Sequence, residues 1–174
     1  MSVITKKICL LGDFNVGKTS LIRRFVEDKF SDRYLSTVGV KVSRKSFKVK
    51  AEFSLHLLNL LIWDLEGNTK FKSITPSYLK GASGAIIVAD LARTNTLSSI
   101  NQHIDLFLQV NPQGTIAIAL NKADLVPQEK LEKLIELHSD RDRDLVLKAY
   151  PTSAKTGKNV SNMFATLSKS LVKS

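Results

Sequence analysis

The chain has 174 residues, of which 43% are hydrophobic and 24% are charged, and it contains one cysteine. This length and composition are typical of one globular domain, residues 1–174, and exclude a disordered or fibrous protein. A single cysteine excludes a disulfide framework, and the three histidines lack the spacing of a zinc site. No apolar run spans a membrane and no secretory signal begins the chain, so we expect a cytoplasmic protein.

The first predicted strand, Ile8 to Leu11, leads into the segment GDFNVGKT, residues 12–19. Two glycines separated by four residues and followed by Lys and Thr form the phosphate-binding loop pattern. Apolar residues at helical spacing follow, so a helix should start near Gly17 and point the positive end of its dipole at the loop. We expect phosphate there, with Lys18 reaching the β and γ phosphates and the Thr19 hydroxyl binding Mg2+.

Residues 30–39 are polar and without periodicity, which predicts a loop. Strand-like stretches from Val40 to Val49 and from Phe53 to Trp63 follow, with a short polar turn between them, and they predict an antiparallel hairpin. Half of positions 41 to 50 are basic, and the whole chain carries a formal charge of +10. Such a strand is typical of a solvated sheet edge, and it has too few aromatic residues for a nucleic-acid-binding surface. The alternative is a contact with an acidic partner or an anionic membrane surface through Lys41, Arg44, Lys45 and Lys48.

The rest of the chain alternates strands and helices. Continuous apolar runs at 85–89 and 116–120 suit parallel strands covered on both faces, and 145–149 supplies one more strand. Amphipathic patterns over 97–108, 131–138 and 160–171 predict helices. This alternation predicts an α/β fold with a doubly wound sheet, in which ligands bind at the carboxyl ends of the strands.

Polar motifs follow these strand ends. Asp64 ends one strand, where a carboxylate can hold a Mg2+-bound water, and the Gly67 N–H three positions later can reach a terminal phosphate. Asn121-Lys122-Ala123-Asp124 follows another. The Asp124 carboxylate can accept hydrogen bonds from N1–H and the 2-amino group of guanine, whereas adenine offers neither donor. Asn121 suits the other guanine edge or the bracing of loops, and the Lys122 stem suits the base face. In Ser153-Ala154-Lys155, the Ala154 N–H suits the guanine O6.

The motifs GDFNVGKT, STVG, WDLEG, NKAD and SAK, in this order, resemble those of small GTPases of the Ras superfamily, closest to the Rab branch, over essentially the whole chain. The resemblance implies a P-loop NTPase fold, the small G domain, with six mostly parallel strands, the second one antiparallel, and about five helices. It implies a GTP/GDP switch in signal transduction, with Mg2+ as cofactor and effector, exchange and activating proteins at residues 30–50 and 64–80.

By this resemblance, Phe30 stacks on guanine, Tyr34 covers the phosphates, and Thr37 binds Mg2+ and the γ-phosphate. The expected metal ligands are Thr19, Thr37 and Asp64, and the expected catalytic residues are Lys18, Thr37 and Asn68. The expected nucleotide-binding residues are Asn15, Val16, Gly17, Lys18, Thr19, Ser20, Phe30, Tyr34, Thr37, Gly67, Asn121, Lys122, Asp124, Ser153, Ala154 and Lys155.

Four positions depart from the family pattern, one of them Asn15, which replaces a glycine that is common there. Asn68 stands where the family has a water-positioning Gln, and a displacement of about 1 Å can lower a rate by about a hundredfold. Glu66 replaces an Ala and brings a carboxylate near the γ-phosphate unless it turns to solvent or finds a basic partner. Phe14 replaces a small residue, and either crowds the space for an activating arginine or folds over a neighbouring loop. We therefore expect slow hydrolysis, with a permanently GTP-bound scaffold as the alternative.

The chain ends in SLVKS without a cysteine for prenylation, and Ser2 excludes N-myristoylation. The expectation is that no lipid anchor lies in this chain. Either an anchor belongs to a removed tail or the protein is an unlipidated member such as those found outside the eukaryotic trafficking machinery. A peripheral position at a membrane surface is the alternative to a purely cytoplasmic location.

Overall fold

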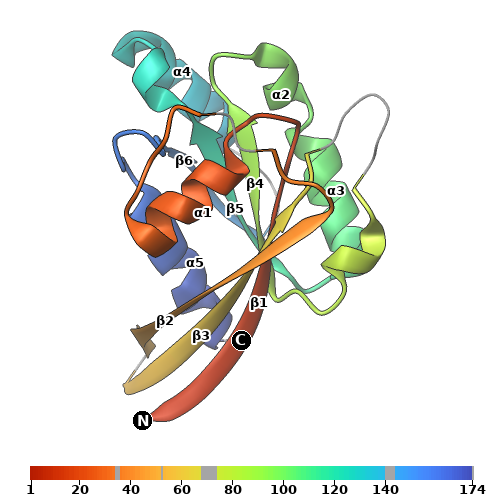
Figure 1. Ribbon diagram of the computed structural model, residues 1–174, viewed down its shortest axis with the longest axis vertical. Helices are drawn as coiled ribbons and strands as arrows, with labels where there is room; N and C mark the ends of the chain where they lie inside the picture. The colour runs from red at the N-terminus through yellow and green to blue at the C-terminus, as the bar shows by residue number, and fades with distance from the viewer. Residues whose placement is uncertain (34–35, 52, 68–73, 140–143, 174) are drawn as a thin grey trace.

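The computed structural model describes residues 1–33, 36–51, 53–67, 74–139 and 144–173. Six strands form one sheet in the order β2-β3-β1-β4-β5-β6 (Figure 1). They are β1 (Ser2–Gly12), β2 (Val40–Ala51), β3 (Ser54–Leu65), β4 (Gly84–Asp90), β5 (Thr115–Asn121) and β6 (Val146–Pro151). β2 pairs antiparallel with β3, while the other described pairings are parallel. The predicted mostly parallel, six-stranded sheet and its hairpin are confirmed.

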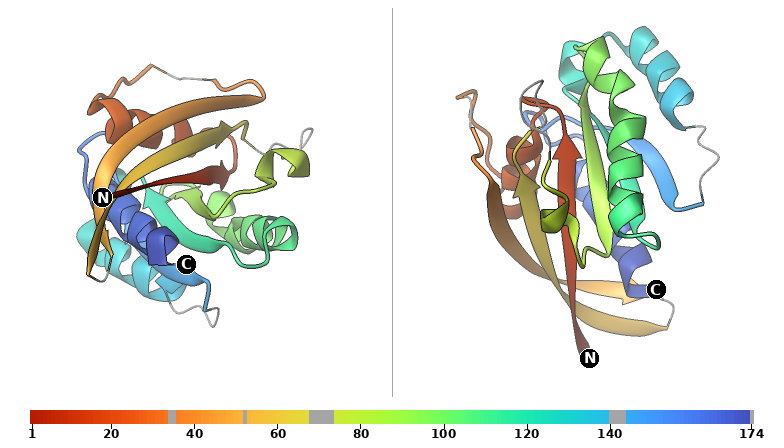
Figure 2. Two further views of the ribbon diagram at one scale, coloured as in Figure 1. Left: turned by 90° about the horizontal axis from the view of Figure 1, so that it is seen from below. Right: turned by 90° about the vertical axis from the view of Figure 1, so that its right-hand side faces the viewer.

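Helices cover both faces of this sheet. The described residues form α1 (Lys18–Glu27), α2 (Thr94–Ser98), α3 (Ile100–Val110), α4 (Gln128–Ser139) and α5 (Val160–Lys173), with short 3-10 turns η1 (Pro76–Leu79) and η2 (Ala123–Leu125). One apolar cluster joins α1 and α5 to one face, and a second joins α3, α4 and η1 to the other (Figures 1 and 2). No helix in the described ranges is both long and apolar enough to cross a bilayer.

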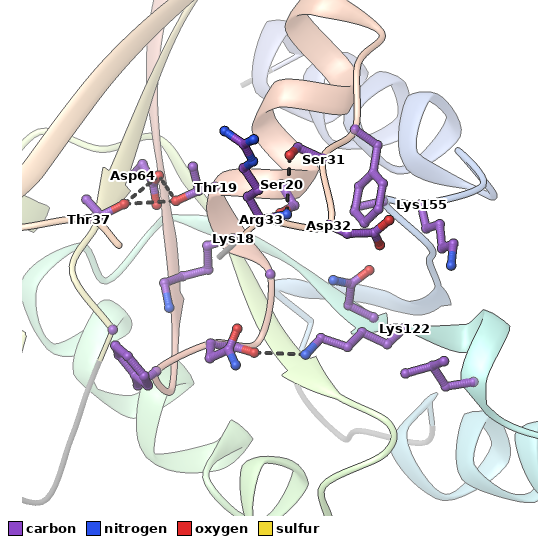
Figure 3. A pocket seen from close by; sticks show the side chains of 18 of the residues that line it. Lys18, Thr19, Ser20, Ser31, Asp32, Arg33, Thr37, Asp64, Lys122 and Lys155 are labelled. Atoms are coloured by element: carbon purple, nitrogen blue, oxygen red, sulfur yellow. Dashed lines mark hydrogen bonds between the residues drawn. The ribbon is translucent and has the colours of Figure 1, made fainter. Parts of the chain in front are cut away.

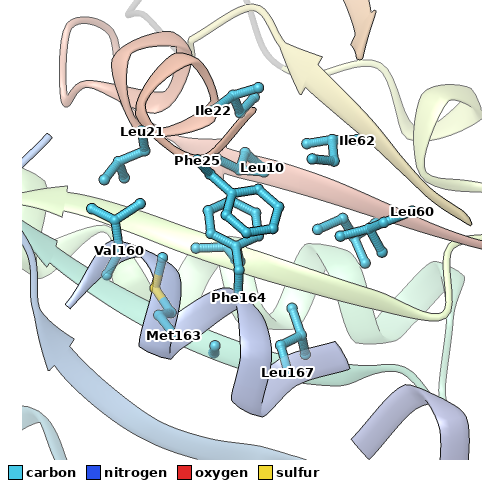
Figure 4. Close-up of a cluster of buried hydrophobic side chains, with 14 of the residues drawn as sticks. Leu10, Leu21, Ile22, Phe25, Leu60, Ile62, Val160, Met163, Phe164 and Leu167 are labelled. Atoms are coloured by element: carbon cyan, nitrogen blue, oxygen red, sulfur yellow. The ribbon is translucent and has the colours of Figure 1, made fainter. Parts of the chain in front are cut away.

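The first apolar cluster fixes α1 against α5. The rings of Phe25 and Phe164 stack with centroids 3.9 Å apart and planes 2° from parallel, and Figure 4 shows them between the two helices. Met163 lies fully buried beside them, as the helical pattern predicts. Burying each such side chain contributes about 1.5–3 kcal/mol. The helix that begins at the glycine-rich loop is thereby held rigidly on the sheet.

The parallel strands carry their carboxyl ends to one edge of the sheet. β4 is buried along its whole length and ends at Asp90, and β5 is almost as deeply buried and ends at Asn121. Such strands have helices over both faces, which is why their sequences read as continuous apolar runs. The polar residues that follow them therefore meet at this edge.

At the opposite edge, β1, β2 and β3 extend beyond the helices (Figure 1). β1 begins at Ser2 rather than at Ile8, since Ser2 to Ile8 continue the parallel pairing with β3. The prediction missed Ser2 to Lys7, because a strand that extends beyond the helices does not have to bury both faces and so lacks a continuous apolar run.

Candidate nucleotide site

A cavity of about 340 Å3 opens at the carboxyl edge of the sheet. Its wall comes from the loop after β1, the start of α1, residues 30–33 with Thr37, the end of β3, and the loops after β5 and β6 (Figure 3). Most residues predicted for the nucleotide and the metal line it: Asn15, Gly17, Lys18, Thr19, Ser20, Phe30, Thr37, Asp64, Gly67, Asn121, Lys122, Asp124, Ala154 and Lys155. Motifs spread over the whole sequence are thus brought to one place.

The remaining predicted residues divide into two groups. The side chain of Val16 is buried in the core, and the Ser153 hydroxyl lies behind Asp124, to whose Oδ1 it donates at 2.7 Å. Tyr34 and Asn68 lie outside the described residues, so their proposed roles stay predictions.

The glycine-rich loop meets α1 at a position that only glycine fits. Gly17 has φ +100°, and a Cβ there would stand 2.4 Å from Asn121 Nδ2. This left-handed conformation turns the chain into α1, whose first hydrogen bond joins the Leu21 N–H to the Gly17 carbonyl at 2.9 Å. The amino end of the helix therefore faces the cavity, as an anion site requires.

Lys18 brings a buried positive charge to this loop. Only 6% of the residue is exposed, and its Nζ donates to the carbonyls of Gly12 at 3.0 Å and Asp13 at 2.9 Å. Burial lowers the pKa of Lys18 to about 8, while the carboxylates of Asp64 and Asp13 oppose this shift. A bound anion would restore the charge that burial disfavours, so this end of the cavity suits phosphate.

Three oxygen-bearing side chains converge beside Lys18 (Figure 3). Thr19 Oγ1 donates to Asp64 Oδ2 at 2.5 Å, and Thr37 Oγ1 lies 2.8 Å from Thr19 Oγ1 and 3.3 Å from Asp64 Oδ2. Burial raises the pKa of Asp64, against the hydrogen bond from Thr19 and the charge of Lys18. In the described part of the chain no donor reaches its buried Oδ1. A carboxylate and two hydroxyls, with one oxygen unsatisfied, fit the oxygen ligands that Mg2+ prefers.

The other end of the cavity is built by the loops after β5 and β6. Asn121 braces them, because its Nδ2 donates to the Val16 carbonyl at 2.9 Å and its Oδ1 accepts from Thr152 at 3.2 Å. Of the two roles expected for Asn121, the structure therefore contains the bracing one. Arg24 fixes the last loop by donating to the carbonyls of Ala154 at 2.8 Å and Lys155 at 2.7 Å. The Asp124 carboxylate stands in the wall between these loops.

Comparison with known proteins agrees with this geometry. The model of the Ras family matches residues 7–173. The chain is 34% identical over 171 residues to Ras-related protein Rab-22A of Homo sapiens, covering 97% of this chain and 84% of that protein. It is 35% identical over 170 residues to GTP-binding protein ypt5 of Schizosaccharomyces pombe, covering 97% and 78%, and 31% identical over 167 residues to Ras-related protein Rab-13 of Canis lupus familiaris, covering 95% and 79%.

The chain belongs to the Ras family. It is a Rab-like small GTPase, a switch that binds guanine nucleotide, hydrolyses GTP and works with regulators and effectors.

Two residues that depart from the family pattern now have positions in this GTPase. Phe14 lines the cavity and is 44% exposed, so part of its ring borders the site. Glu66 accepts a hydrogen bond at Oε2 from the Gly39 N–H at 3.0 Å. Its carboxylate is thereby directed to the loop that carries Thr37, an arrangement that the sequence did not predict.

Sequence reasoning missed part of the wall and the groups behind it. Ser31, Asp32, Arg33, Leu65 and Leu125 also line the cavity. No motif indicated them, because loop residues gain such positions from the course of the backbone. Their only signal was proximity to Phe30, Asp64 and Asp124, which were predicted.

Two polar clusters hold the phosphate loop from behind. Asp90 Oδ2 pairs with Arg93 at 3.0 Å and with Lys122 at 2.8 Å. These two cations donate in turn to the Phe14 carbonyl at 2.7 Å and to the Asn15 carbonyl at 3.0 Å. Hydrogen bonds to the charged form outweigh burial and lower the pKa of Asp90, so it remains an anion that links both cations.

The second cluster reaches the loop from α3. His103 Nε2 donates to Asp13 Oδ1 at 2.9 Å, and the Ser99 hydroxyl donates to Asp13 Oδ2 at 2.9 Å. Burial lowers the pKa of His103 and so favours the neutral ring, while the Asp13 carboxylate opposes this shift. His103 therefore supports the phosphate loop, although 90 residues of sequence separate it from Asp13.

Proposed function

We propose that residues 1–174 act as one Mg2+-dependent GTP/GDP switch domain with slow intrinsic hydrolysis. The observation that carries this proposal is a single cavity with two different ends. Thr19, Thr37 and Asp64 converge beside the buried ammonium of Lys18 at one end, and Asp124 stands with Ala154 at the other. This arrangement suits a triphosphate at one end and a purine base at the other.

At the phosphate end, Lys18 and the N–H groups of residues 15–20 would bind the β and γ phosphates. Thr19 and Thr37 would hold the metal directly, with Asp64 holding it directly or through water. Bound Mg2+ supplies positive charge that neutralises the phosphate oxygens. Gly67 would direct its N–H to the γ-phosphate, and it packs so closely on the loop that a Cβ would stand 2.6 Å from Phe14 Cα.

At the base end, the Asp124 carboxylate would accept from N1–H and the 2-amino group of guanine. The Ser153 hydroxyl, at 2.7 Å from Asp124 Oδ1, supports this role because it fixes the orientation of the carboxylate. Phe30 and the Lys122 stem would cover the two faces of the base, and the Ala154 N–H would bond O6. Adenine would leave the carboxylate unpaired, and a site built in this way rejects such a base strongly.

Slow hydrolysis is proposed from two residues. Asn68 is shorter than a Gln by one methylene and would hold the attacking water too far from the γ-phosphate. Phe14, exposed in the cavity wall, would obstruct an arginine supplied by an activating protein. Both effects leave nucleotide binding intact.

Single-turnover hydrolysis of GTP by Asn68→Gln tests this proposal. We expect about tenfold or more acceleration with unchanged GTP affinity, because a correctly placed water shortens the productive distance. Phe14→Ser serves as the companion variant, which should respond more to an activating protein than in intrinsic rate. An unchanged rate in Asn68→Gln would remove Asn68 from the mechanism. No phosphate release at all from the wild type would favour the permanently GTP-bound scaffold.

The partner surface that we propose is the open sheet face, defined as Arg44, Lys48 and Lys50 of β2 with Leu55 of β3 and Val3 of β1. All five are exposed, and the register places Lys50 beside Leu55 and Lys48 in the same row as Val3. The sequence groups Lys41 and Lys45 with these basic residues. Both stand at odd positions of β2 and therefore lie on the other face of the sheet from Arg44 and Lys48. Lys45 contacts the carbonyl and the ring of Phe25, so it belongs to the α1 side.

An anionic membrane is the partner that this face suits best, because it is basic and interspersed with exposed apolar side chains. The protein would then act at the cytoplasmic surface of a membrane, peripherally. We expect Lys48→Gln/Lys50→Gln to lose binding to phosphatidylserine vesicles, and Lys130→Gln/Lys133→Gln on α4, with the same charge change, to keep it. Binding should weaken steeply with salt. Equal retention by both variants would refute the surface, and binding only to acidic proteins would replace the membrane as its partner.

A further inference from the structure

Glu66 takes part in the pairing of β2 with β3 through its side chain. Val40 lies opposite Leu65 in the register, so the next pair is Gly39 with Glu66. The Glu66 N–H donates to the Gly39 carbonyl at 2.8 Å, as in an antiparallel ladder. The Gly39 N–H, however, donates to Glu66 Oε2 at 3.0 Å. The carboxylate therefore replaces a backbone carbonyl as acceptor and extends the pairing by one residue.

This Glu66–Gly39 pair lies beside the proposed metal ligands. Gly39 follows Thr37 by two residues, and Thr37 Oγ1 is 2.8 Å from Thr19 Oγ1 and 3.3 Å from Asp64 Oδ2. A hydrogen bond to a carboxylate is stronger than one to a neutral carbonyl. Two hydrogen bonds thus fix the backbone close to Thr37 and limit how far its hydroxyl can move away.

We propose that Glu66 is a positioning residue that holds Thr37 near Thr19 and Asp64 in the GDP form as well as in the GTP form. This inference rests on the proposed switch function, in which the γ-phosphate and the metal draw Thr37 into place. Hydrolysis removes the γ-phosphate but leaves the Glu66–Gly39 pair intact. Residues 36–39 therefore change less between the two forms than they would with an apolar side chain at position 66.

The exchange rate of the Gly39 amide, measured by NMR in the Mg2+–GDP complex, tests this role. We expect the wild type to protect this amide and Glu66→Ala to exchange it about ten- to a hundredfold faster, since a charge-assisted hydrogen bond is lost. Glu66→Gln keeps an acceptor oxygen and should stay within a few-fold of the wild type. Glu136→Ala, which removes an exposed carboxylate of α4, is the matched control and should leave the rate unchanged.

Three results would overturn the inference: equal rates in Glu66→Ala and the wild type, a Glu66→Gln rate as fast as that of Glu66→Ala, or an unprotected Gly39 amide in the wild-type GDP complex. The third result is obtained with the wild type alone. In the wild type, protection of the Gly39 amide should be similar with GDP and with a non-hydrolysable GTP analogue. GDP affinity measured on the same samples separates the two proposals. If GDP does not bind, the proposed function fails; if GDP binds while the exchange contradicts the pattern above, only the role of Glu66 fails.

Discussion

Raising the pH from 7 to 9 is expected to weaken GDP binding by about tenfold, because Lys18 loses its proton in the free protein and keeps it in the complex. Lys18 is 6% exposed, and burial lowers its pKa from 10.5 to about 8. Bound phosphate raises this pKa again, so binding above pH 8 takes up a proton. In the nucleotide-free protein, the charged Lys18 lowers stability below pH 8, and this penalty falls as the pH rises from 8 toward 10.5.

Titration of a fluorescent GDP analogue at constant ionic strength and saturating Mg2+ measures this dependence. Lys18→Arg is the control, because a guanidinium stays protonated throughout the range, so any slope that it retains belongs to other groups. Subtracting that slope should leave the contribution of Lys18. The reasoning is refuted if the wild-type affinity is constant from pH 7 to 9, or if Lys18→Arg shows the same decrease.

Three substitutions test other parts of the account. Gly67→Ala would place a Cβ 2.6 Å from Phe14 Cα. In competition binding it should weaken the affinity for GTP more than that for GDP, by about tenfold or more, because a charge-assisted hydrogen bond to the γ-phosphate is lost. Equal effects on both affinities would contradict the γ-phosphate contact. Asp124→Asn should bind xanthosine diphosphate in preference to GDP, and unchanged guanine preference would reject the base assignment. Phe164→Ala should lower the free energy of unfolding, measured in urea, by about 3–5 kcal/mol. A loss under about 1 kcal/mol would show that the stacking of Phe25 on Phe164 does not hold α1 against α5.

The sheet and its helices were predictable because each element has one dominant periodicity. The buried strands at 84–90 and 115–121 are continuous apolar runs, and α5 repeats its apolar residues at helical spacing. The exceptions are the segment 97–108, which was predicted as one helix and forms parts of α2 and α3, and the first half of β1, because the predicted strand began at Ile8. A strand beyond the helices does not need apolar residues on both faces, so periodicity gives no signal there.

Within the site, motif residues were predictable and their supports were not. Lys18, Asp64 and Asp124 follow strand ends at spacings that phosphate, metal and guanine require. The pairing of His103 with Asp13, by contrast, joins residues 90 positions apart, and depends on how α3 packs beside the loop. The same holds for Glu66, because the orientation of a side chain at a strand end is decided by the neighbouring strand rather than by local sequence.

Calorimetric titration of nucleotide-free protein with GDP and with ADP, each with Mg2+, tests whether one cavity selects guanine and holds Mg2+ beside the phosphates. We expect GDP to bind about 10⁴-fold more tightly than ADP, because adenine leaves the Asp124 carboxylate unpaired. We also expect chelation of Mg2+ to weaken GDP binding, because Thr19 and Asp64 would then lack the ion that joins them to the phosphates. Equal affinities for GDP and ADP, or no GDP binding with Mg2+ present, would refute both roles of the cavity.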